Sequence, residues 1–107
     1  MATDQEEQVW GALGDRTRRE IVLRLSEGPR PVGELATYLP VSRSAVSQHL
    51  KVLKDAGLVA EEVAGTRRIY RLNAAGVIAL RDQLDTFWDR ALSGFQDLVT
   101  PPPEEKA

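Results

Sequence analysis

The stretch Ser42–Ala56, SRSAVSQHLKVLKDA, decides the fold of this chain of 107 residues. At about 100° per residue in a helix, Val46, Leu50 and Leu53 fall within a narrow arc, and we expect them to face a core. The serine that opens the stretch is a favoured N-cap, and the following Gly57 is a favoured C-terminal stop. The pattern therefore predicts one amphipathic helix with a defined beginning and end.

The residues before this helix predict a second helix very close to it. Val32–Leu39 has helical apolar spacing and ends at Pro40, so only Pro40 and Val41 link it to Ser42. Two helices joined by so short a turn must cross at a large angle, which is the helix-turn-helix arrangement. Further upstream, the helical spacing of apolar residues and the positions of helix-breaking residues predict helices over about 4–13 and 16–26.

The residues after Gly57 predict a β-hairpin and a long final helix. Two arms, 58–63 and 67–72, flank a bend that contains Gly65, and the second arm alternates as a strand does. A helix is predicted from about 74 to 99. The fold class is thus mostly α with a small β-hairpin (α+β), a winged helix-turn-helix of about five helices and a two-stranded wing. We expect one domain over 1–100 and a disordered tail over 101–107.

Composition limits the function classes. The chain has no cysteine, which excludes disulfides, thiolate metal sites and cysteine nucleophiles. No apolar run approaches the ~18 residues of a membrane span, and the acidic N-terminus does not resemble a secretion signal. We therefore expect a cytoplasmic protein without membrane contact. No glycine-rich phosphate loop or nucleophile elbow appears, so an enzyme is not expected.

Charge is distributed unevenly along the chain. The formal net charge is −2, but residues 16–72 hold eleven basic residues against six acidic ones, and both flanks are acidic. Phosphate attraction depends on the local field more than on the total charge. The basic middle section is therefore compatible with a nucleic-acid partner.

The outer face of the helix over 42–56 carries hydroxyls, one amide and several cations, and the hairpin adds two arginines at its tip. Alone, such a face is more often the solvated side of an amphipathic helix. Its position after a tight turn and before a basic hairpin favours binding to double-stranded DNA. The predicted DNA-contacting residues are Ser42, Arg43, Ser44, Ser47, Gln48, His49, Lys51, Lys54, Thr66, Arg67 and Arg68. The alternative is a winged-helix module that binds an acidic protein partner.

Several joined motifs resemble the ArsR-type family of bacterial repressors. They are Gly14–Ile21, Val32–Ala36, Val41–Leu53, Ala56–Val59 and Gly65–Leu72, within a resemblance that covers about residues 8–99 in order. The resemblance implies a winged helix-turn-helix dimer that binds an imperfect palindrome in a promoter and blocks transcription, often of its own gene.

The chain departs from the family's metal sensors. Those proteins use a cysteine pair on the helix before the recognition helix, or Asp, His and Glu ligands on the last helix, and neither set is present here. Asp82, Asp85 and Asp89 share one face of the last predicted helix, but carboxylates alone suit hard ions. We interpret them as a solvated acidic face. His49 has no second strong ligand nearby in the sequence, and a packing or phosphate-binding role is favoured over metal ligation. No metal and no cofactor are expected.

The last predicted helix has a wide apolar stripe. It extends over about 26 residues, roughly 39 Å at 1.5 Å per residue, which is more than the rest of a small domain can cover. Part of the stripe must belong to the core of the chain itself, and the excess predicts a two-fold dimer interface built from the first and last helices. The predicted interface residues are Val9, Trp10, Leu13, Leu80, Leu84, Phe87, Trp88, Ala91, Phe95 and Leu98.

Overall fold

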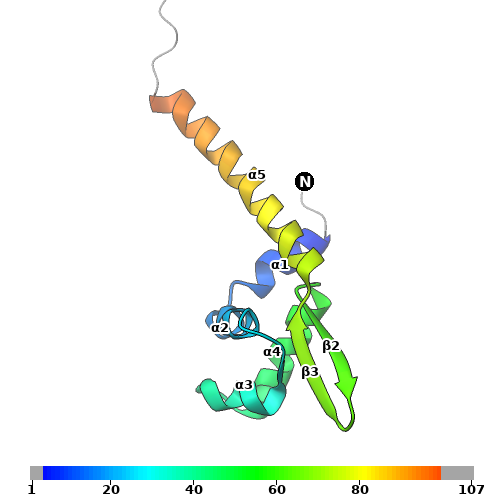
Figure 1. Ribbon diagram of the computed structural model, residues 1–107. Helices are drawn as coiled ribbons and strands as arrows, with labels where there is room; N and C mark the ends of the chain where they lie inside the picture. Colours follow the sequence, from blue (N-terminus) through cyan, green and yellow to red (C-terminus); the bar gives the residue numbers. More distant parts are fainter. Residues whose placement is uncertain (1–3, 100–107) are drawn as a thin grey trace, which may run out of the picture. The chain divides into compact units, whose positions relative to one another are not determined.

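The structure is a computed structural model that describes residues 4–99. The helices are α1 (Asp4–Ala12), α2 (Arg16–Leu25), α3 (Val32–Tyr38), α4 (Arg43–Asp55) and α5 (Ala74–Val99), and the strands are β1 (Arg30–Pro31), β2 (Val59–Ala64) and β3 (Arg67–Leu72) (Figure 1). All five predicted helices and both hairpin arms are confirmed, and no bound differs from the predicted one by more than one residue. The predicted tail over 101–107 lies outside the described residues.

Helix α4 begins and ends where its sequence indicates. The Ser42 hydroxyl oxygen accepts a hydrogen bond from the backbone N–H of Ala45 at 3.1 Å, so one orphan donor of the first turn is satisfied. Gly57 follows the helix with φ of 84°, a conformation in which a side chain is strained. Between these ends Val46, Leu50 and Leu53 are fully buried, as predicted.

The core forms where α1, α2, α3 and the hairpin meet α4. Helix α4 contacts α1, α2, α3 and β2, and it therefore lies at the centre of this part of the fold. The buried apolar residues are Val9, Ala12, Ile21, Leu25, Leu35, Leu39, Val46, Leu50, Leu53, Ala56, Leu58, Val59 and Tyr70. Apolar burial of this kind is the dominant favourable term in folding, and here it holds the exposed face of α4 in a fixed position.

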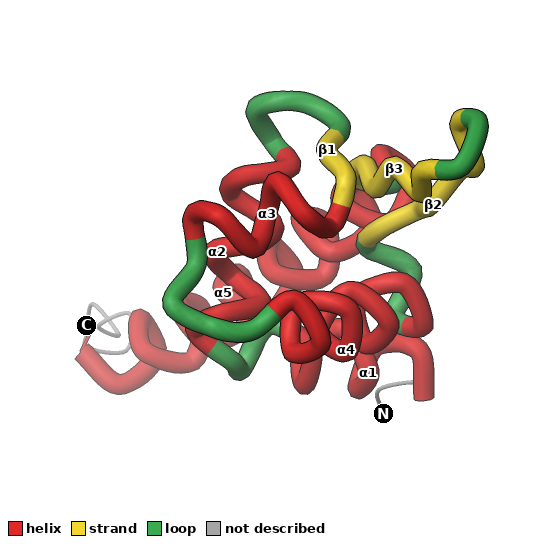
Figure 2. Tube along the Cα trace, turned by 90° about the horizontal axis from the view of Figure 1, so that it is seen from below, coloured by secondary structure: helices red, strands yellow, loops and turns green. Residues whose placement is uncertain are grey.

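The wing belongs to a three-stranded antiparallel sheet with the order β1-β3-β2 (Figure 2). Strands β2 and β3 form the predicted hairpin, in register from Val59 opposite Leu72 to Ala64 opposite Arg67. Strand β1 was not predicted. It pairs Pro31 with Ile69 at the edge of the sheet, where a proline is tolerated because no neighbouring strand needs its missing N–H.

The chain divides into two compact units, Met1–Val77 and Ile78–Ala107. The first holds the sheet, α1 to α4 and the first turn of α5. The described part of the second is the remainder of α5, in which no residue is fully buried. Within residues 4–99, no helix combines the length and the apolar character that a membrane span requires.

Candidate nucleic-acid interface

A groove of about 850 Å³ lies between α4, the N-terminal end of α3 and the β2–β3 hairpin. Its lining residues are Pro31, Val32, Gly33, Glu34, Arg43, Ser47, Lys51, Lys54, Glu61, Thr66, Arg67, Arg68 and Tyr70. Seven of the eleven predicted DNA-contacting residues belong to this lining, from two segments separated in the sequence. The groove therefore brings the cations of the helix and of the wing to one surface.

Two of these cations have no carboxylate partner. Within residues 4–99, neither Arg43 nor Arg67 forms an ion pair. The guanidinium of Arg43 extends toward the start of α3, where its Nη1 would lie 3.7 Å from a β-carbon built at Gly33. Both guanidinium groups are therefore available to an anionic ligand, because no acid among the described residues pairs with them.

The other three cations of the groove are paired. Lys51 Nζ lies 2.9 Å from Asp55 Oδ2 on the exposed side of α4, where such a pair contributes little. Lys54 Nζ donates to Glu61 Oε1, and Arg68 Nη1 lies 3.6 Å from Glu61 Oε2. Lys54 lowers the pKa of Glu61, with further contributions that include the Tyr70 hydroxyl and Arg68, and Glu61 in turn raises the pKa of Lys54.

The remaining predicted residues of α4 differ in role. Ser44, Ser47 and Gln48 are exposed on the outer side of the helix, where hydroxyl and amide groups are available to hydrogen-bond partners. The hydroxyl of Ser42, by contrast, is engaged as the N-cap of α4. Its position at the start of α4 contributes to the orientation of the helix.

His49 faces α2. Its Nδ1 lies 3.3 Å from Arg18 Nη1, and the histidine is only partly exposed. Arg18 also donates through Nε to the carbonyl of Ala12, at the C-terminal end of α1. The histidine thus belongs to a polar junction between α1, α2 and α4, which agrees with the packing role that its position in the sequence suggested.

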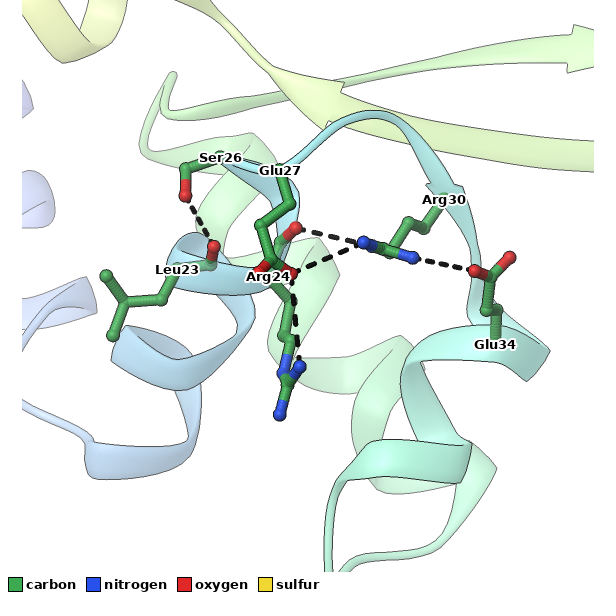
Figure 3. A network of polar contacts seen from close by, with 6 residues as sticks. All are labelled: Leu23, Arg24, Ser26, Glu27, Arg30 and Glu34. Atoms are coloured by element: carbon green, nitrogen blue, oxygen red, sulfur yellow. Dashed lines mark hydrogen bonds and ion pairs between the residues drawn. The ribbon is translucent and has the colours of Figure 1, made fainter.

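A second polar network holds β1 against the helices (Figure 3). Arg30 donates to Glu34 Oε1 at 2.7 Å and to Glu27 Oε1 at 3.3 Å, and its Nε donates to the carbonyl of Arg24. Glu34 belongs to the groove lining, so this pairing neutralises one of the two acids there. The arginine also fixes the edge strand next to the start of α3.

Sequence patterns missed the acidic members of the groove. Glu34 lies on α3, whose proximity to α4 was predicted, but no pattern indicates that its side chain reaches the groove. No spacing rule links Lys54 to Glu61, because Gly57 reverses the chain direction between them. A signal did exist in the composition: Glu61 and Glu62 are two acids in the otherwise basic hairpin.

The predicted dimer residues differ in exposure. Val9 is buried at 5% exposure, so its side chain already packs within its own unit. Leu13 and Leu80 are partly exposed. Trp10 is exposed, and on α5 the predicted residues Leu84, Phe87, Trp88, Phe95 and Leu98 are exposed to 38–86%. The rings of Phe87 and Trp88 pack edge to face, with centroids 5.3 Å apart.

In the described part of the chain, no three acidic or histidine side chains gather closely enough to hold a metal ion.

A capped helix that follows a tight turn, beside a β-hairpin with an exposed basic tip, defines the winged helix-turn-helix class of DNA-binding proteins. The family model described as "Bacterial regulatory protein, arsR family" matches residues 15–61. The chain belongs to this ArsR family of bacterial regulatory proteins, and it is a transcriptional regulator, not an enzyme.

Relatives and solved structures agree with this assignment. The HTH-type transcriptional regulator Rv2034 of Mycobacterium tuberculosis is 60% identical over 93 residues, which are 87% of each chain. The transcriptional repressor SdpR of Bacillus subtilis is 30% identical, over 84% of this chain and 97% of its own. The solution structure of a homodimeric winged helix-turn-helix DNA-binding domain from Mycobacterium bovis has a TM-score of 0.67 at 32% identity, covering 85% of this chain and 84% of that one.

Proposed function

We propose that this regulator is a homodimeric repressor that binds a two-fold-symmetric operator, a promoter sequence in double-stranded DNA, and that its own promoter is among its targets. The observation that carries the proposal is the groove between α4 and the wing, where Arg43 and Arg67 form no ion pair with any residue of 4–99 and lie beside the exposed hydroxyl and amide groups of α4. Such a surface suits both the phosphates and the base edges of DNA.

Helix α4 is the proposed recognition helix. In this class of protein the recognition helix enters the major groove with its N-terminal residues toward the base edges. Ser44, Ser47 and Gln48 would hydrogen-bond bases there, and Arg43 would pair with guanine or a phosphate. Arg67 at the tip of the wing would bind the sugar-phosphate backbone, which positions the protein without selecting a sequence.

The exposed apolar face of α5 supports a dimer. Phe87 and Trp88 are both 52% exposed, and Phe95 is 58% exposed. Large exposed apolar patches are typical of interaction sites. The homodimeric assembly of the M. bovis domain supports a second copy of this chain as the occupant. A two-fold dimer would place two recognition helices about 34 Å apart, one turn of DNA.

Repression follows from occupancy of a promoter, because bound protein and RNA polymerase would compete for the same DNA. The repressor function of SdpR supports this direction of control. We also propose that the winged helix-turn-helix and α5 act as one DNA-binding and dimerisation domain, and that the protein works in the cytoplasm, where promoter DNA lies in bacteria.

A footprint tests the proposal. The full chain is incubated with an end-labelled fragment that contains the DNA upstream of its own gene, and the fragment is cut with a nuclease. We expect one protected region whose two halves are related by approximate two-fold symmetry, with half-site centres about 10 base pairs apart. No locally protected region at any protein concentration below the onset of non-specific coverage would rule out autorepression through this fragment.

A further inference from the structure

Glu61 lies between two of the predicted DNA-contacting cations. It projects from β2, and its carboxylate accepts a hydrogen bond from Lys54 in the last turn of α4. On its other side, Oε2 lies 3.6 Å from Nη1 of Arg68 in β3. Glu61 therefore connects the wing to the recognition helix through Lys54, and it connects the two strands of the wing through Arg68.

The carboxylate of Glu61 is largely buried, whereas the two cations that contact it are more exposed. The side chain of Glu61 is 20% exposed, against 47% for Lys54 and 68% for Arg68. The oxygen Oε2 is buried without a well-formed hydrogen bond within residues 4–99, and the neighbouring Tyr70 hydroxyl adds to the effect of Lys54 in keeping the pKa of Glu61 low. The two cations stabilise this largely buried carboxylate. Moving them to another anion would leave it unpaired, which costs free energy.

This arrangement separates Lys54 and Arg68 from Arg43 and Arg67. Among the described residues Arg43 and Arg67 have no acidic partner, whereas Lys54 and Arg68 must give up Glu61 before they can bind a phosphate. Each phosphate contact raises affinity for every DNA sequence alike, because it replaces bound counterions and carries no base information. An acid that retains cations therefore weakens binding to every sequence and makes binding less dependent on salt.

We propose that Glu61 limits the affinity of this protein for DNA, because it withholds Lys54 and Arg68 from the phosphate backbone and so restrains binding to every sequence. The inference rests on the proposed DNA-binding function. It assigns to an acid on the wing control over the sequence-independent part of the affinity, which the base-contacting residues of α4 do not supply.

The test compares Glu61→Gln with Glu62→Gln. Both variants remove one negative charge from the same strand, but the side chain of Glu62 is exposed and forms no ion pair within the described residues. The dissociation constant of each full-length variant is measured for a random duplex and for the footprinted duplex, over a series of salt concentrations, by fluorescence anisotropy. A thermal melt of each variant confirms that it is folded.

For Glu61→Gln we expect the slope of log affinity against log salt on random duplex to steepen by about one to two. Near 0.15 M salt, affinity for random duplex should rise by about fivefold for each cation released. The ratio of operator to random affinity should stay at the wild-type value, because the released cations contact phosphates in both complexes. Glu62→Gln should leave the slope unchanged. Equal slopes for the two variants, or a changed ratio, would overturn the inference.

Lys54→Gln provides a second arm. In the wild-type background it should barely change the salt slope, because Lys54 is held by Glu61. In the Glu61→Gln background the same substitution should reduce the slope by about one. Equal reductions in both backgrounds would also count against the inference. Failure of the proposed function has a different signature, since the wild-type chain would then show no preference for the upstream duplex.

Discussion

The Cα of Gly76, in the first turn of α5, lies directly against the backbone carbonyl of Gly57, so that a β-carbon built at Gly76 would be 1.9 Å from that carbonyl oxygen. The same carbonyl accepts a hydrogen bond from the Asn73 side-chain amide at 3.0 Å. The end of the recognition helix and the start of α5 are therefore joined through backbone atoms. These atoms cannot move aside as the end of a flexible side chain can.

Gly76→Ala should destabilise the fold strongly. The added methyl group meets backbone, and we expect the free energy of unfolding to fall by about 3 kcal/mol. Urea denaturation measures this change. Gly94→Ala is the matched control in the same helix, because a β-carbon there meets nothing within 4 Å. It should stabilise by about 0.5–1 kcal/mol through helix propensity. Equal effects of the two substitutions would contradict the close approach at Gly76.

The stability contributed by the side-chain N-cap Asp15 of α2 should depend on pH, and that contributed by the N-cap Ser42 of α4 should not. The Asp15 carboxylate accepts from the backbone N–H of Arg18 at 3.0 Å, and this hydrogen bond holds the pKa of Asp15 below its ordinary value of 3.8. A lowered pKa contributes stability that is fully present above pH 3.8 and is lost as the pH falls through the folded-state value. Asp15→Asn should therefore destabilise at pH 7, and its difference from wild type should shrink toward pH 3.

Ser42→Ala is the control for that experiment. Ser42 caps α4 with a hydroxyl that does not titrate, and its loss should cost about 1 kcal/mol at every pH. Denaturant titrations of wild type and both variants at pH 7, 5 and 3 provide the comparison. A gap between Asp15→Asn and wild type that stayed constant over this range would show that the charge of Asp15 does not stabilise α2.

Gln48→Ala and Arg67→Gln should separate specificity from affinity. Gln48 is exposed on the outer face of α4, and its removal should cost about 1–3 kcal/mol of discrimination at one base pair. Arg67 is exposed at the wing tip, and its neutralisation should weaken all sequences alike and reduce the salt slope by about one. Binding to a panel of single-base operator variants checks both. The assigned roles would be contradicted if Gln48→Ala weakened all sequences alike and Arg67→Gln lost discrimination at one base pair.

Phe95→Glu should dissociate the proposed dimer. Phe95 is 58% exposed on the apolar face of α5, and a buried unpaired carboxylate at a two-fold interface is costly. Ser93→Glu introduces the same charge on the opposite side of the helix and should leave the assembly intact. Sedimentation equilibrium measures the mass of each. A wild-type chain that sedimented at its 11.8 kDa monomer mass would refute the dimer itself.

Local signals explain why so much of the fold could be predicted from sequence. The spacing of Val46, Leu50 and Leu53, with Ser42 before and Gly57 after them, specifies α4 without reference to the rest of the chain. The alternation of side chains along the arm after Gly65 specifies the hairpin in the same way. These elements are encoded by residues that are near neighbours along the chain.

The missed features all depend on contacts between distant segments. Strand β1 exists because Arg30 and Pro31 lie beside β3, some forty residues later, and not because of any strand propensity of their own. Arg18 and His49 are 31 residues apart. The pairing of Lys54 with Glu61 requires the chain to reverse at Gly57. Spacing along one element cannot predict any of these contacts.

The most direct test of the central claim is the dissociation constant of the full-length protein for the duplex upstream of its own gene, measured beside a shuffled duplex of identical composition at 0.15 M salt. Sequence recognition by α4 predicts that the upstream duplex binds at least about a thousand times more tightly. Equal affinity for the two duplexes would contradict the account, because it would reduce the groove between α4 and the wing to a surface that binds phosphate alone.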